Sequence, residues 1–488
     1  MKDLVRMTRR GRVAALAVAG LAAACAPNLG KLPHLATPSD FATRRSFAVP
    51  ETHWPAQNWW LQFHDSELTA LITEGLKGAP DLRIAEARLR QAAGVAEEAG
   101  ATELPSLNGT ASVMSTKPNV NNGFPPFIKP YLPHGWHTEI STALDFNYDF
   151  DFWGKNRATL AAATSQEQAA AADVAEARLS LSTAIASTYA KLVALETDLR
   201  TLKQAVRVRE QSAQLVQSRV QHGLENQGPL AQARAEVAIA KGQLAQIAGE
   251  IARTRHQIAA LLGKGPDAGL AISPQETVQP LAYGLPPALP ADLVGRRPDI
   301  VAARLEAEVA AQRIKVARAG FYPDINLSAQ IGNESLDPRD FFNKGSIMGA
   351  VGPAVHLPIF EGGQLEGAYR GARARYEEAV ATYDKTLAHA FAQVADALSD
   401  AKTLSAEISD AHMALVESER AYQVAKIRYR GGLSRYLNVL TAENTVLQQQ
   451  QSLADLKSDA FLQNIALIRA LGGGFDVRGT ALASNTKR

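Results

Sequence analysis

The feature that most constrains this chain is an internal repeat. The sequence Pro80-Asp81-Leu82 opens an alanine-rich stretch that ends at Pro105, and Pro298-Asp299-Ile300 opens a second one that ends at Pro323. Both intervals are 25 residues long. Further landmarks follow in the same order, at an offset between 208 and 218 residues: Phe152-Trp153-Gly154 and Phe360-Glu361-Gly362, Gly223-Leu224 and Gly432-Leu433, Leu262-Gly263 and Leu471-Gly472. Agreement of so many spaced landmarks indicates two copies of one structural unit.

The two copies give the domain organisation. The first repeat covers residues 60–264 and the second covers 291–473, and a linker rich in proline and glycine, 265–290, joins them. The tail 474–488 looks irregular. Each repeat is predicted to run helix, strand, strand, long helix, helix.

The strand pattern is clearest between Ile140 and Phe152, where aliphatic and aromatic side chains alternate with acidic and polar ones. This stretch of 13 residues exceeds the usual strand length, and aromatic side chains near its end are typical of a transmembrane β-strand. A half-buried strand of a soluble sheet is the alternative. Strands are predicted at about 106–115, 138–152, 324–332 and 346–359. The polar side chains predicted to line a water-filled lumen, where they would favour cations, are Asp145, Asn147, Asp149 and Asp151.

The predicted helices are very long. Between Gly154 and His222 the chain has no internal glycine or proline, so one helix of about 69 residues would reach roughly 100 Å. Its counterpart covers 364–430, and the long helices of the two repeats occupy about 154–263 and 364–471. Apolar side chains at spacings of three and four in the second helix predict a coiled-coil seam: Leu365, Tyr369, Ala372, Tyr376, Val380, Tyr383, Leu387, Phe391, Val394 and Leu398. A generic amphipathic core helix is the alternative, but few globular domains hold helices of this length.

The N-terminus resembles an export signal. Residues 1–24 carry five basic side chains before an apolar run of twelve residues, which is too short to span a bilayer. Cys25, the only cysteine, follows small residues and resembles the lipobox of bacterial lipoproteins, although Leu21 stands one place earlier than the usual pattern. We therefore expect a signal peptide over 1–24, and diacylglycerol and palmitate on Cys25 at the head of a lipid-anchored segment, 25–59. The alternative is conventional cleavage beside an ordinary cysteine. An Asp after the cysteine would resemble the inner-membrane retention signal, so Ala26 favours the outer membrane.

Composition excludes several classes of protein. The chain has a net charge of +2, and residues 1–24 alone carry +4, so about −2 remains and nucleic-acid binding gains no support. A single cysteine permits no disulfide within the chain. The closest histidines, His134 and His137, lack neighbouring ligands for a metal, and no phosphate-binding loop or catalytic constellation appears. We therefore expect no enzyme activity, no metal and no cofactor.

Assembly follows from the number of strands. No apolar stretch after residue 24 approaches the roughly 20 residues of a membrane helix, so any membrane crossing must use strands. Four strands cannot close a barrel, and lipid does not tolerate open strand edges. Two chains would give eight strands, about the number at which side chains fill the interior, whereas three chains give twelve strands and an open lumen.

Several motifs carry a resemblance to a known family. They are Trp59-Trp60 with Phe63, Gly78-Ala79-Pro80-Asp81-Leu82, Phe150-Asp151-Phe152-Trp153-Gly154, Gly295-Arg296-Arg297-Pro298-Asp299-Ile300, and Phe321-Tyr322-Pro323. The chain resembles the TolC-like outer-membrane efflux factors, in particular the lipid-anchored OprM and NodT branch, over nearly its whole length after the signal.

The resemblance implies a mainly α fold with transmembrane β-strands. It also implies a homotrimer that forms a 12-stranded β-barrel and a periplasmic α-helical barrel. Such a trimer would be the passive exit duct of a tripartite system for drugs or other small molecules, with a periplasmic adaptor (membrane fusion protein) and an inner-membrane pump of the resistance-nodulation-division (RND) class or a similar one. A duct for type I protein secretion and a non-conducting periplasmic coiled-coil scaffold lipoprotein are the alternatives.

The resemblance also implies two kinds of site residue. The family closes its periplasmic end just after the second long helix, which here places the gate at Leu437, Asn438 and Thr441. The aspartates typical of relatives are absent at these positions, so a steric constriction by Leu437 is the prediction. Gly223, Gly431 and Gly432 resemble the helix tips that meet the adaptor, although glycine is equally the usual residue at any helix end.

Overall fold

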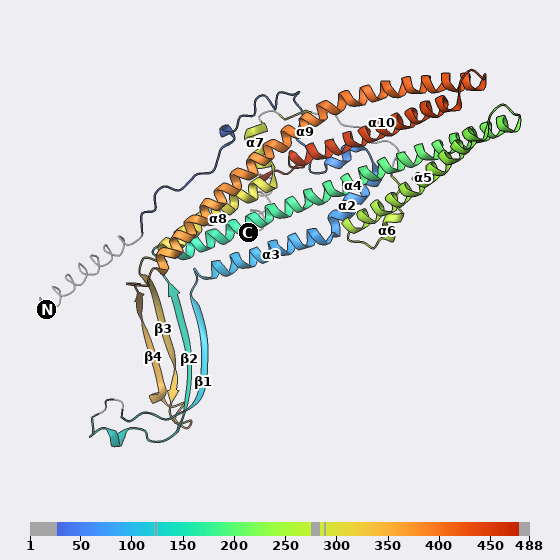
Figure 1. Cartoon of the computed structure of the whole chain (residues 1–488). Coiled ribbons are helices and arrows are strands. Elements are labelled where there is room, and N and C mark those ends of the chain that lie inside the picture. Colours follow the sequence, from blue (N-terminus) through green and yellow to red (C-terminus); the bar gives the residue numbers. More distant parts are fainter. Residues whose placement is uncertain (1–26, 122, 124, 275–283, 287–288, 478–488) are drawn as a thin grey trace. The chain divides into compact units, whose positions relative to one another are not determined.

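The computed structural model describes residues 27–477 except 122, 124, 275–283 and 287–288 (Figure 1). The predicted signal peptide and Cys25 lie outside the described residues. The described chain forms two compact units, and each contains parts of both repeats. One unit comprises residues up to 34 with 90–169 and 304–381, and the other comprises 35–89, 170–303 and 382 onward.

The same series of elements occurs twice. The first series is α3 (Pro80–Ala101), β1 (Ser106–Thr116), β2 (His137–Asp149), α4 (Lys155–Gln221) and α5 (Gln227–Leu261). The second series is α8 (Pro298–Ala319), β3 (Asp324–Ser335), β4 (Ile347–His356), α9 (Gln364–Arg430) and α10 (Tyr436–Ala470). Shorter helices α2 (Ser66–Gly78) and α7 (Leu289–Arg296) precede the two series, and α6 (Asp267–Leu270) follows the first.

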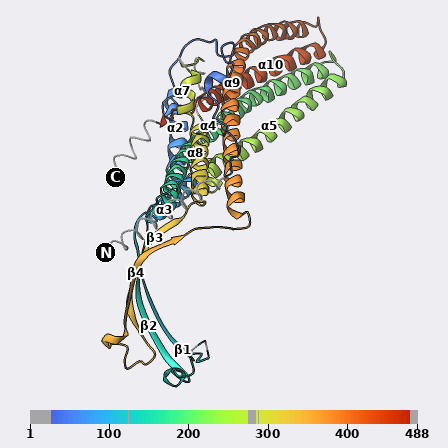
Figure 2. The same ribbon diagram turned by 90° about the vertical axis from the view of Figure 1, so that its left-hand side faces the viewer.

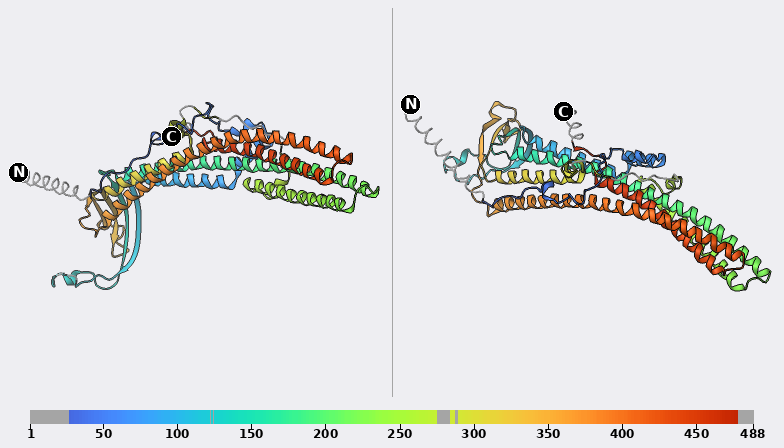
Figure 3. Two further views of the ribbon diagram at one scale, coloured as in Figure 1. Left: turned by 45° about the horizontal axis from the view of Figure 1, so that its top comes forward. Right: turned by 90° about the horizontal axis from the view of Figure 1, so that it is seen from above.

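The matched helices have equal lengths. α3 and α8 have 22 residues each, α4 and α9 have 67 each, and α5 and α10 have 35 each. Figure 3 shows α5 running back along α4 and α10 running back along α9, as two helical hairpins. The predicted fold class, with two repeats, four strands and long helices, is confirmed. In the part of the chain that the structure describes, no helix is both long and apolar enough to cross a membrane.

The four strands form one antiparallel sheet in the order β1-β2-β3-β4 (Figure 2). β2 pairs with β3 and so joins the two repeats, with Asp145 opposite Gln330. β1 and β4 are the edges of this sheet. β3 extends to Ser335, beyond the predicted end, and β4 ends at His356, before it.

β2 also ends earlier than predicted, at Asp149 instead of Phe152. The cause lies two residues further on, because Asp151 takes a left-handed conformation with φ of 42°. Residues other than glycine rarely adopt this backbone conformation, and it does not continue a strand. The alternation of side chains continues through this point in the sequence, but the extended backbone does not.

The coiled-coil seam predicted on α9 is buried. Eight of its ten residues are buried, and Leu365 and Tyr376 are half-buried. Tyr383, Leu387 and Phe391 pack with Leu293 of α7 and Ile300 of α8. A second core surrounds Trp59 and Phe63, which contact α2, α4 and α10. These cores explain the burial of the Trp59-Trp60 and Phe63 motif.

Candidate functional site

The sheet has one polar face and one apolar face. Successive side chains of a strand point to opposite faces, so the pairing register assigns every residue to a face. All charged side chains, and all amide side chains except Asn333 on the opposite face, share one face: Asn108, Glu139, Asp145, Asn147, Asp149, Asp324, Asn326, Gln330 and Glu334. The opposite face carries Leu107, Val113, Ile140, Leu144, Phe146, Tyr148, Ile325, Leu327, Ile331, Ile347, Val351 and Val355. Within these four strands there are five acidic residues, all on the polar face, and no lysine or arginine.

Hydrogen bonds connect the polar face across both repeats. Gln330 Nε2 donates to Asp145 Oδ1 at 2.9 Å, and Thr110 Oγ1 donates to Asp145 Oδ2 at 3.3 Å. Asn326 Nδ2 donates to Asn147 Oδ1 at 3.2 Å. Asp145 and Asn147 were predicted from the sequence, but their partners were not, because only the pairing of β2 with β3 brings together residues 185 positions apart.

Asp151, predicted to share this face, is not on the strand. Its Oδ1 accepts from the Asn156 backbone N–H and its Oδ2 from that of Arg157, each at 3.0 Å. Burial acts to raise the pKa of Asp151, but these hydrogen bonds and the Arg157 guanidinium outweigh it and lower the pKa. Asp151 therefore anchors the first turn of α4, and its predicted place on β2 is wrong.

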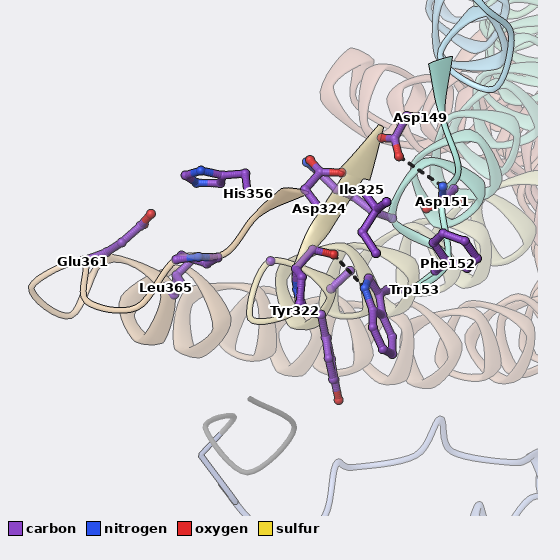
Figure 4. A pocket seen from close by; sticks show the side chains of 15 residues that line it. Asp149, Asp151, Phe152, Trp153, Tyr322, Asp324, Ile325, His356, Glu361 and Leu365 are labelled. Atoms are coloured by element: carbon purple, nitrogen blue, oxygen red, sulfur yellow. Dashed lines mark hydrogen bonds and ion pairs between the residues drawn. The ribbon is translucent and has the colours of Figure 1, made fainter. Parts of the chain in front are cut away.

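A cavity of about 210 Å³ lies where the strands meet α4, α8 and α9 (Figure 4). Trp153 stacks on Tyr322 with ring centroids 4.5 Å apart and donates from Nε1 to the Pro323 carbonyl at 2.8 Å. Lys155 Nζ lies 3.7 Å from Asp324 Oδ2, and Asp149 accepts from the Asn156 amide at 3.0 Å. These contacts connect the ends of the strands with the neighbouring helices, so the residues around the cavity have a structural role.

The predicted gate residues occupy one face of α10. Leu437, Asn438 and Thr441 are exposed in the single chain, and Leu437 is 54% exposed. The opposite side of the same turns, with Tyr436 and Leu440, packs against α4, α5 and α9. The buried side of these turns therefore fixes the orientation of the three side chains, which point away from the core of the chain.

The predicted helix tips are two similar turns. Gly223 and Gly432 have φ of +69° and +72°, a conformation that favours glycine. The residue after each glycine donates from its backbone N–H to a carbonyl near the helix end: Leu224 to Arg219 and Leu433 to Arg428, both at 2.8 Å. Gly431 has no positive φ. Gly223 and Gly432 are therefore required by the backbone of the turns, whatever contacts they make.

A buried ionic cluster, which sequence reasoning missed, joins three helices near these turns. Arg209 of α4 is 7% exposed and lies 3.6 Å from Glu443 of α10 and 3.5 Å from Glu236 of α5. Its Nη2 donates to Asn444 Oδ1 at 2.7 Å. Burial raises the pKa of Glu443, and Arg209 opposes this effect. The only sequence signal was a set of charged residues at positions where the helical pattern is otherwise apolar.

Comparisons with known proteins agree on one family. The family model for outer membrane efflux proteins matches residues 71–264 and 289–473. The multidrug resistance outer membrane protein MdtP of Escherichia coli K12 is 32% identical over 438 residues, which cover 86% of this chain and 87% of that protein. The fusaric acid resistance protein FusA of Burkholderia cepacia is 35% identical over 373 residues, which cover 74% of this chain and 69% of that protein.

Solved structures have the same fold. The crystal structure of the outer membrane protein VceC from Vibrio cholerae superimposes with a TM-score of 0.81 and 42% sequence identity, and the match covers 87% of this chain and all of VceC. The family implies non-enzymatic trimeric channels of the outer membrane that have a periplasmic helical domain and act with pump partners. The chain belongs to the outer membrane efflux protein family and is an efflux channel of a small-molecule export system.

Proposed function

We propose that three copies of this chain form the passive exit duct of a tripartite efflux system. Each copy contributes its four strands to a 12-stranded β-barrel, and the long helices form an α-helical barrel in the periplasm. The observation that carries this proposal is the sheet, which has one apolar face, one polar face and two edges, β1 and β4, that each pair on one side only within the described chain. In lipid, such edges need partners, and closure with further copies provides them.

The polar face lines the lumen and the apolar face contacts lipid in this assembly. Asp145, Asn147 and Asp149 then face the passage together with Glu139 and Glu334. Five acidic side chains per chain, with no basic side chain on these strands, give a lumen that favours cations. Asp151 is not part of this lining.

The helical end carries the gate and the docking surface. Leu437, Asn438 and Thr441 form the constriction, which is steric because none of the three is charged. The turns at Gly223 and at Gly431 and Gly432 meet a periplasmic adaptor, which connects the duct to an inner-membrane pump of the RND class or a similar one. The duct itself supplies no energy.

The lipid anchor rests on the sequence. Removal of the signal peptide leaves Cys25 at the N-terminus, where diacylglycerol and palmitate attach the chain to the outer membrane. For the cargo, the names of two relatives refer to multidrug resistance and to fusaric acid resistance, which supports small organic molecules.

Conductance and mass test the proposed duct together. Purified full-length protein is expected to have the mass of a trimer and to form discrete channels in a planar bilayer. A monomer or dimer that never conducts, with the helical content intact, would favour a periplasmic scaffold. Co-purification with an ABC-type exporter would instead favour a role in protein secretion.

A further inference from the structure

Asp198 of α4 is a buried carboxylate that has no counterion among the described residues. The residue is only 8% exposed, and its Oδ1 has no hydrogen-bond partner among the residues that the structure describes. Burial of an unpaired charge is strongly unfavourable, so such a carboxylate tends to bind a proton instead. The position therefore differs from that of a surface aspartate on a long helix.

The two helices packed beside α4 bring more negative charge toward Asp198. Burial is the main cause that raises the pKa of Asp198 to about 6, and Asp455 of α10 and Glu250 of α5 raise it further. The pKa of Asp455 is itself raised by burial and by Asp459. Asp455 is exposed and Glu250 is partly buried, so Asp198 is the one buried carboxylate of the three.

The basic side chains near Asp198 pair with other groups, and one of them pairs with Glu250. Arg255 of α5 bonds to Glu196 of α4 at 3.0 Å, and Arg253 lies 3.8 Å from Glu250. Arg200 donates from Nη2 to Thr197 Oγ1 at 3.0 Å. The buried Glu443 provides a contrast further along α10, because Arg209 lies 3.6 Å from it. Arg209 partly offsets the burial of Glu443, and no cation of the described residues does so for Asp198.

We propose that Asp198 is a proton-binding site, whose protonation the negative charges of Asp455 and Glu250 favour, and that α4 packs more firmly against α5 and α10 when Asp198 is protonated than when it is ionised. The ligand is a proton from solvent. The consequence for transport rests on the proposed duct: the helical part of the duct would be held together more firmly in mild acid than at neutral pH.

The direction of the pH dependence follows from linkage. In the unfolded chain Asp198 has an ordinary pKa of about 3.9. Because its pKa in the folded protein is raised to about 6, the folded state binds more protons between these two values. The stability contributed by this group is therefore complete in acid, falls as the pH rises from about 4 to 6, and changes little above that range.

The main test uses the assembled full-length protein in detergent and follows its thermal unfolding between pH 5 and 8. The wild type is expected to lose thermal stability as the pH rises through 6. Asp198→Asn should have a higher midpoint than the wild type at pH 7.5 and a smaller loss between pH 5 and 7. A residual loss is expected, because the pKa values of Glu176, Glu443 and Asp455 are also raised. Asp410→Asn removes an exposed carboxylate of α9 and should behave like the wild type.

A second variant and a direct readout keep the test decisive if Asp198→Asn does not assemble. Asp455→Asn removes a charge that raises the pKa of Asp198, so its loss of stability should occur at lower pH. Infrared difference spectra should show a protonated carboxyl group at pH 5.5 that is absent from Asp198→Asn or reduced in Asp455→Asn. Variants that keep the pH dependence and infrared bands of the wild type would overturn the proposal. Conductance measured on the same samples tests the duct separately.

Discussion

At the scale of single residues, buried charged side chains have two different environments in the compact unit that comprises 35–89, 170–303 and 382 onward. Arg209 contacts carboxylates from two other helices, so the cost of burying these charges is partly offset. Asp198 has no such partner in the part of the chain that the structure describes. The first arrangement connects three helices through one buried cation, and the second makes their packing depend on pH.

Replacement of Arg209 by methionine should destabilise the helical unit by about 3 kcal/mol, because Glu443 is then buried without a counterion. The double variant Arg209→Met with Glu443→Leu should recover much of this loss, since it removes both charges and leaves apolar side chains of similar volume. Denaturant unfolding of the two single variants and the double variant measures the coupling. Additive losses in the double variant would show that the ion pair contributes nothing.

At the scale of elements, the sheet concentrates negative charge on one face. Gln330 and Thr110 hold the carboxylate of Asp145 by hydrogen bonds, so its position relative to the strands is fixed. A fixed charge on a lumen wall acts on passing ions more strongly than a mobile one at a loop tip. The selectivity of the duct should therefore depend on β2 more than on the loops.

The variant Asp145→Asn with Asp149→Asn should reduce the preference for cations over anions, because it removes two carboxylates per chain and six per trimer. Reversal potentials in a salt gradient across a planar bilayer measure the preference. Asp340→Asn removes a carboxylate outside the strands and serves as the matched control. An unchanged reversal potential in the double variant would place this face outside the passage.

Elements of this chain differ in how well they can be predicted from sequence. The bounds of α4 were predicted closely because its 67 residues without glycine or proline leave few alternatives and repeat the helical period many times. The end of β2 was predicted wrongly, since alternation of side chains does not reveal the left-handed backbone of Asp151. The partners of Asp145 depend on which strands are neighbours, and a periodic pattern within one strand contains no such information. Arg209 and Asp198 were missed because a charged residue on a helix is usually exposed.

At the scale of the whole molecule, the proposed gate would form only in the assembly. Leu437 is exposed in one chain, and only copies arranged around an axis could bring several of these side chains together. The buried residues on the opposite side of the same turns, Tyr436 and Leu440, fix its direction within the chain. The size of the opening would then depend on both the side chain and the packing of the helices behind it.

Leu437→Ala should increase the conductance of the closed channel severalfold, because three side chains at one level are shortened together. Single-channel recording at neutral pH measures this effect. Leu433→Ala, which shortens an exposed leucine at the nearby turn, should leave the conductance unchanged. If both variants conduct like the wild type, the constriction lies elsewhere.

The equal lengths of the paired helices restrict how this family member could change by insertion or deletion. α4 matches α9 and α5 matches α10 residue for residue, with a constant separation of 209 positions. One extra residue in a single helix would move everything beyond it by about 1.5 Å along the axis and rotate it by about 100°. In a wall built from alternating copies of the two repeats, that change would misplace one hairpin tip relative to its neighbours. An insertion or deletion in one of these helices is therefore tolerated only when the matching helix of the other repeat changes by the same number of residues. The two repeats are expected to have gained and lost residues in parallel during evolution.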